Sequence, residues 1–151
     1  MVRVNDEIKY NINLKPTTSW NDKVETTVTD TLSKGLKYKT GSARVGTTAT
    51  EPTITNNDDG TTTLTWKVNL KKQTNLTYNV EVVNGYVNNK VSNKAVAKIG
   101  DVEYNLGELE NPLPNKKYAD DTPNGKDGAK VEKGNVIKYS ITYKKILLVR
   151  D

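Results

Sequence analysis

Apolar and polar residues alternate along most of this chain, as they do in strands that bury one face. In the segment DEIKYNINL, residues 6–14, every second residue from Ile8 to Leu14 is apolar and the residues between them are polar. A period of two places all the apolar side chains on one side of an extended strand. The segment is therefore predicted to be a half-buried strand whose apolar face is turned toward a core.

The same pattern predicts further strands separated by polar turns. The candidates are VETTVTDTL at 24–32, LKYKT at 36–40, TEPTITN at 50–56, TTTLTWKVNL at 61–70, TYNVEVVNG at 77–85 and KVSNKAVAKIGDVEYNL at 90–106, the last of which supplies one or two strands. Asp59-Gly60 favours a hairpin between two of them. About seven short strands at regular intervals predict an all-β fold, an immunoglobulin-like β-sandwich.

The composition excludes several kinds of chemistry. The 151 residues include neither cysteine nor histidine, so disulfides, thiolate metal sites and the usual general base at neutral pH are all absent. We therefore expect no metal, no cofactor and no turnover enzyme.

The charge distribution also limits the classes of partner that the chain is expected to bind. The net charge is +5, but the lysines are scattered along the chain instead of forming one basic cluster. Nucleic-acid binding normally requires such a cluster, so no nucleic-acid partner is expected. No apolar stretch has the length of a membrane span, and no membrane insertion is expected from this fragment.

The chain contains an internal copy of its opening strand. The segment NVIKYSITY, residues 135–143, repeats DEIKYNINL with Ile137 in the place of Ile8, which gives a period of 137 − 8 = 129 residues. Between the copies, ENPLPN carries two prolines that break the strand pattern. We predict a β-sandwich repeat lacking its first strand at 1–110, a proline-containing linker at 111–115, and the beginning of a following repeat at 116–151.

Four segments carry a resemblance to a known family. VNDEIKYNINL, VTDTLSKGLKYKTGS, VSNKAV and GAKVEKGNVIKYSITY occur in this order. The order resembles the repeat domains of Gram-positive cell-surface and pilus-type proteins, the DUF11-like and D2-type sandwiches. The resemblance implies an extracellular, cell-wall-associated parent protein in which this repeat is a stalk or spacer, with neighbouring repeats as its partners.

Many domains of this family form a spontaneous isopeptide bond between lysine and asparagine, assisted by a buried acid. The resemblance assigns the assisting acid to Asp30 in VTDTL and the amide to Asn93 in VSNKA. It assigns the amine to Lys116 in PNKKY, with Lys117 as the second choice. The implied activity is at most one autocatalytic turnover per chain.

Burial explains why such a bond can form without a cofactor. Desolvation lowers a lysine pKa and raises an aspartate pKa, by roughly 3–5 units for fully buried groups. A neutral amine is a nucleophile, and a protonated carboxyl group can bond the amide oxygen and shuttle protons as ammonia leaves. Without the family resemblance, Asp30 and Asn93 would be taken as ordinary turn or strand-end residues.

The sequence leaves two questions open, the placement of the strand after the linker and the function of the domain. The strand that follows the linker can fold back onto its own domain, insert into a neighbouring molecule to give a strand-exchanged homo-oligomer, or remain loose. The alternative to a spacer is an adhesive module that binds a host matrix protein or carbohydrate through its loops.

Overall fold

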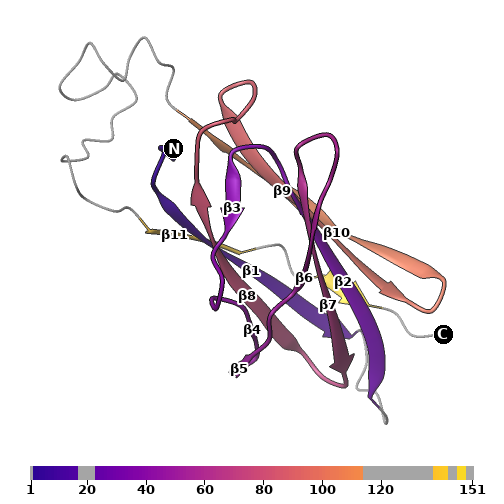
Figure 1. Cartoon of the computed structure of the whole chain (residues 1–151). Coiled ribbons are helices and arrows are strands. Elements are labelled where there is room, and N and C mark those ends of the chain that lie inside the picture. Colours follow the sequence, from indigo (N-terminus) through magenta and orange to yellow (C-terminus); the bar gives the residue numbers. More distant parts are fainter. Residues whose placement is uncertain (1, 17–22, 114–137, 143–145, 149–151) are drawn as a thin grey trace, which may run out of the picture.

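The described residues form strands and turns without a helix. The computed structural model describes residues 2–16, 23–113, 138–142 and 146–148 (Figure 1). Two sheets stack face to face, so the predicted all-β sandwich is confirmed. No helix of the described residues has the length and apolar character of a membrane span.

The larger sheet contains seven strands. These are β1 (Glu7–Pro16), β3 (Leu36–Tyr38), β4 (Arg44–Val45), β5 (Thr48–Ala49), β8 (Thr74–Val82), β11 (Lys138–Thr142) and β12 (Ile146–Leu148). Their order is β11-β1-β8-β4-β5, with β3 also beside β8 and β12 also beside β1. β1 is antiparallel to β8 and parallel to β11 and β12.

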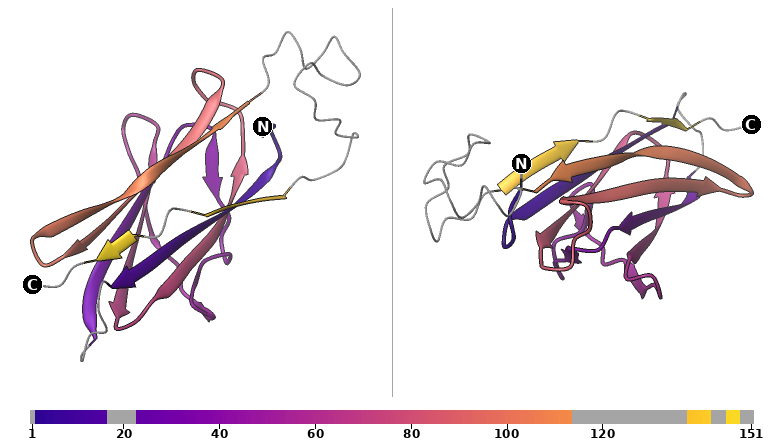
Figure 2. Two further views of the ribbon diagram at one scale, coloured as in Figure 1. Left: turned by 180° about the vertical axis from the view of Figure 1, so that it is seen from behind. Right: turned by 90° about the horizontal axis from the view of Figure 1, so that it is seen from above.

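The second sheet contains five strands. These are β2 (Val24–Leu32), β6 (Thr53–Asn56), β7 (Thr62–Leu70), β9 (Lys90–Ile99) and β10 (Val102–Pro112). Their order is β10-β9-β2-β7-β6, and every pair of neighbours is antiparallel. Figure 2 shows this sheet packed across the strands of the larger one.

Most predicted strands are present at the predicted places. β2 has the bounds expected from VETTVTDTL, and β6 and β7 form the hairpin expected around Asp59-Gly60, where Gly60 has a φ of 86°. The described strands number more than the seven expected. The additional strands β4, β5 and β12 have two, two and three residues, too few for an alternating pattern to indicate them.

The core lies between the sheets and consists of the alternate residues that the pattern predicted. Ile8, Tyr10, Ile12 and Leu14 of β1 all have 0% exposure. Trp66 of β7 is 2% exposed, and its indole Nε1 donates to the backbone oxygen of Thr50 at 3.0 Å. Trp66 is thus a core aromatic, and its polar atom is bonded where it is buried.

The last strand before the segment 114–137 is β10. β10 continues through Asn111 and Pro112, two residues into the predicted linker. Proline is tolerated there because β10 is an edge strand, and the backbone oxygen of Pro112 accepts from the Val2 N–H at 3.0 Å. The segment 114–137 lies outside the described residues, so the proposed start of a following repeat at residue 116 stays a prediction.

Candidate cross-linking site

Asp30 and Asn93 come from adjacent strands of the five-stranded sheet. In the antiparallel pairing of β2 with β9, the direct partner of Asn93 is Leu32, and Asp30 stands two residues before Leu32. Two such positions are diagonal neighbours on the same face of a sheet. That face is the inner one, since Asp30 is 0% and Asn93 1% exposed. The structure therefore brings together the acid and the amide that the family resemblance assigned.

Direct hydrogen bonds join the two side chains. The amide Nδ2 of Asn93 donates to both carboxylate oxygens of Asp30, at 3.2 Å to Oδ1 and 3.0 Å to Oδ2. The hydroxyl of Tyr78 also donates to Asp30 Oδ2, and Asn93 Nδ2 lies 3.4 Å from the Tyr78 hydroxyl oxygen. Asp30, Asn93 and Tyr78 form a buried polar cluster, called here the buried triad.

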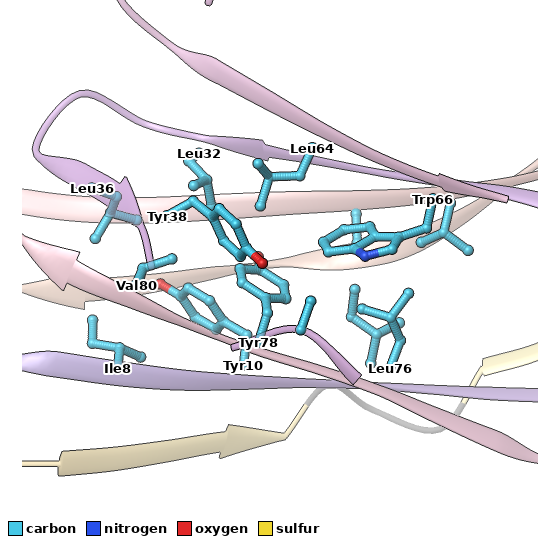
Figure 3. Close-up of a cluster of buried hydrophobic side chains, with 14 of the residues drawn as sticks. Ile8, Tyr10, Leu32, Leu36, Tyr38, Leu64, Trp66, Leu76, Tyr78 and Val80 are labelled. Carbon is cyan, nitrogen blue, oxygen red and sulfur yellow. The ribbon is translucent and has the colours of Figure 1, made fainter. Parts of the chain in front are cut away.

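Tyr78 is the member of the triad that the sequence did not identify as a site residue. It lies on β8 of the other sheet, so its hydroxyl reaches the carboxylate across the interior of the sandwich. Its ring is held among Tyr10, Tyr38 and Trp66, with centroid separations of 5.5, 6.1 and 5.2 Å (Figure 3). The alternation in TYNVEVV indicated burial of Tyr78, but it carried no information about the partner of the hydroxyl.

The electrostatic influence of the triad extends to Tyr10. Burial raises the pKa of Tyr10 above its ordinary value, and the negative charge of Asp30 raises it further. Tyr10 is paired directly with Tyr78 in the antiparallel contact of β1 and β8. The triad thus lies in a water-poor interior where charges act strongly on their neighbours.

The hydrogen bonds differ in one respect from the chemistry expected from the sequence. We expected the carboxyl group of Asp30 to bond the amide oxygen of Asn93, but it bonds the amide nitrogen. This nitrogen is the atom that departs as ammonia when an amine displaces it. Asp30 therefore lies beside the atom that would leave in such a displacement.

The lysines predicted to supply the amine lie outside the described residues. Both predicted donors, Lys116 and Lys117, fall in the segment 114–137. Among the described residues, no group of three or more acidic, histidine or cysteine side chains is arranged to hold a metal ion.

The sequence of this chain matches a known family over most of its length. A family model described as the C-terminal domain of the uncharacterised plasmid protein pXO2-29 matches residues 2–103, more than half of the chain. No curated protein sequence matches the chain.

Solved structures with a similar fold come from Gram-positive surface proteins. The N-terminal domain of the Streptococcus gordonii adhesin Sgo0707 is 14% identical with a TM-score of 0.53, over 74% of this chain and 29% of that one. Domains D2 and D3 of the major pilin SpaD from Corynebacterium diphtheriae are 19% identical with a TM-score of 0.52, over 72% of this chain and 47% of that one. This chain spans less than half of either structure, and at these identities the likeness shows the fold alone.

Proposed function

The chain belongs to the family of the pXO2-29 C-terminal domain, and on that premise we propose that it is a stalk or spacer repeat of a cell-wall-associated surface protein. The proposal includes an autocatalytic amide cross-link between Asn93 and a lysine, assisted by Asp30. The observation that carries it is the buried triad, in which a carboxylate bonds a carboxamide between two sheets. The folds of SpaD and Sgo0707 support an extracellular location.

The reaction is a transfer of the Asn93 acyl group from one nitrogen to another. The neutral amine of lysine attacks Asn93 Cγ and forms the new carbon–nitrogen bond. The bond from Cγ to Nδ2 then breaks, and Nδ2 leaves as ammonia. Asp30 takes the proton that the amine loses and passes it to Nδ2, so Asp30 ends the reaction in its starting state. Lys116 is the proposed amine, with Lys117 second, as expected from the family resemblance.

The surroundings of the triad favour this reaction over hydrolysis. Asp30, Asn93 and Tyr78 are almost fully buried, so water has little access to Asn93 Cγ. The hydrogen bond from Tyr78 holds the carboxylate in place, and the neighbouring rings hold Tyr78. A group held at reacting distance gains a high effective concentration, which replaces much of the help that a cofactor would supply.

A cross-link from β9 to the segment after β10 would suit a load-bearing stalk. It would restrict the unfolded chain as a disulfide does, which typically adds about 2–4 kcal/mol to the free energy of unfolding. It would also keep β10 attached to β9 when the chain is pulled. Since the chain contains no cysteine, a disulfide cannot supply this cross-link.

Intact mass under denaturing conditions tests the cross-link. The full chain is expected to weigh less than its sequence predicts by one ammonia, and peptide mapping should find Asn93 joined to Lys116 or Lys117. Asn93→Ala and Asp30→Ala should restore the full mass. Asn69→Ala, at an exposed position of β7, is the matched control and should retain the loss.

An unmodified mass for the wild-type chain would overturn the cross-link while leaving the spacer function standing. The spacer function has its own test, a screen of the chain against collagen, fibrinogen and glycans. A spacer should show no saturable binding. Saturable binding would instead favour the adhesive module that the sequence left as the alternative.

A further inference from the structure

The lateral edges of the two sheets differ in their ability to accept another strand. β5, at one edge of the larger sheet, has two residues, and β6, at one edge of the smaller sheet, has four and follows Pro52. β10, at the other edge of the smaller sheet, is interrupted between Asn105 and Gly107, where Gly107 has a φ of 106°. Short strands, prolines and bulges are features that prevent pairing at an edge.

The outer edge of β1 has none of these features over most of its length. β1 has ten residues, pairs with β8 without a register shift, and carries its one proline at the last position. Its outer edge pairs in parallel with β11 and β12, which Figure 2 shows lying along β1. β1 therefore offers a long regular edge, and a strand from far along the chain occupies it.

The register of this pairing shows which edge of β11 is used. β11 belongs to the copy of the opening strand, and Tyr139 corresponds to Tyr10 in sequence, but in the sheet Tyr139 stands opposite Ile8. The copy is thus shifted by two positions. Backbone N–H and C=O groups alternate between the two edges of a strand with a period of two. After an even shift, corresponding residues of β11 and β1 therefore direct these groups to the same side.

Each edge of β11 therefore lies on the same side as the edge of β1 formed by the corresponding residues. β11 therefore meets β1 through the edge that corresponds to the edge of β1 bonded to β8. If the copy became the opening strand of a following sandwich, that edge would be needed for the strand equivalent to β8. Pairing of β11 with β1 and folding of the copy into its own sandwich are mutually exclusive.

We propose that the outer edge of β1 is an acceptor for a parallel strand, and that a second copy of this chain donates its 138–142 segment to it. A strand from another copy would make the same backbone contacts as the strand of the same chain. In this register, Lys138 of the donated strand is paired with Glu7 of β1, a residue of opposite charge. The proposal does not depend on the cross-link of the proposed function.

The length of the connection allows both arrangements. Residues 114–137 separate the last described residue of the sandwich from β11, which is 137 − 113 = 24 residues. Pairing within one chain does not depend on protein concentration, whereas pairing between two copies is a bimolecular event. Exchange between copies should therefore increase with protein concentration.

Single cysteines in the full chain test the proposal, because the natural chain contains none. Lys9 and Ser140 are direct partners across the β1–β11 pair, and neighbouring strands lie about 4.8 Å apart, within disulfide range. Lys9→Cys and Ser140→Cys chains, one of them labelled with nitrogen-15, would be mixed at rising concentrations and oxidised. Mass spectrometry would measure the mixed disulfide. Lys67→Cys mixed with Ser140→Cys is the matched control, because Lys67 is exposed on β7 of the other sheet.

The mixed disulfide of Lys9→Cys with Ser140→Cys is expected to exceed the control several-fold and to fall on dilution. A yield equal to the control at every concentration would overturn the second copy as donor. One chain carrying both cysteines tests the acceptor edge separately, and it should form an intramolecular disulfide at low concentration. Failure of that disulfide to form would overturn the acceptor edge itself.

Discussion

Two polar clusters of this sandwich have the same local geometry in different surroundings. In the buried triad, Asp30 accepts from the amide of Asn93, at 3.0 Å to Oδ2. On the outer side of the larger sheet, Glu7 Oε1 accepts from the amide Nδ2 of Asn79 at 2.8 Å. In both clusters, the asparagine stands diagonally from the carboxylate on the neighbouring antiparallel strand.

The third member of each cluster shows how the surroundings differ. Asp30 also accepts from Tyr78, which is 0% exposed. Glu7 also accepts from Lys39 Nζ at 3.1 Å, and the side chain of Lys39 is 57% exposed. Water can replace the exposed lysine as a partner of Glu7, whose own side chain is 12% exposed, but neither described partner of Asp30 is exposed, so similar hydrogen bonds should contribute different free energies.

Removing each carboxylate in turn should show this difference most strongly. Asp30→Ala should lower the free energy of unfolding by about 3–5 kcal/mol, because two buried donors lose the carboxylate that they bond. Glu7→Ala, the matched control, should lower it by less, about 1–2 kcal/mol, because the lysine partner of Glu7 is exposed to water. Denaturant titration measures both values, and intact mass distinguishes lost hydrogen bonds from a lost cross-link. Equal losses from the two variants would contradict the comparison.

Removing one hydroxyl should have a smaller effect. Tyr78→Phe keeps the ring but removes the donor to a charged acceptor, which should cost about 1.5–3 kcal/mol. In a double-mutant cycle, Tyr78→Phe and Asp30→Ala should be strongly non-additive because they remove the same contact. Tyr78→Phe combined with Glu7→Ala should be additive. Additivity in the first cycle would mean that the contact between Tyr78 and Asp30 adds nothing.

Tyr38 provides a contact that depends on pH. Its hydroxyl donates to Glu51 Oε1 at 2.9 Å, and burial, followed by Glu51, raises its pKa from 10.0 to about 12. Because the folded state holds this proton more tightly, the contribution should be complete below pH 10.0 and lost as the pH rises through about 12. Tyr38→Phe should reduce the alkaline slope of the unfolding free energy, and an unchanged slope would refute the assignment. Tyr10, whose pKa is also raised, should leave part of the slope in place.

The smallest effect is expected at the exposed donor. Lys39→Met removes the ion pair with Glu7 and should change the free energy of unfolding by about 0.2–1 kcal/mol. The change should shrink further at high salt, where exposed charges are screened. Thermal unfolding at low and high salt measures it. A loss as large as that of Asp30→Ala would show that the outer cluster is not open to water.

Particular residues show how far the sequence predicted the structure. The bounds of β2 and the burial of Ile8, Tyr10, Ile12 and Leu14 followed from alternation, because strand geometry has a period of two. Asp30 and Asn93 were singled out from short motifs, and the structure places them in contact. Tyr78 was not singled out from the sequence, because its contact with Asp30 joins the two sheets and residues 48 positions apart.

The sequence by itself determined that the chain forms strands and which face of each strand is apolar. Those properties are local, since each depends on residues a few positions apart. Only the tertiary structure decided that Tyr78 contacts Asp30, that one carboxylate–asparagine pair is fully buried and another only partly buried, and that β1 has its outer edge beside a distant strand. These outcomes depend on register and on the stacking of two sheets, which bring together segments that no local pattern connects.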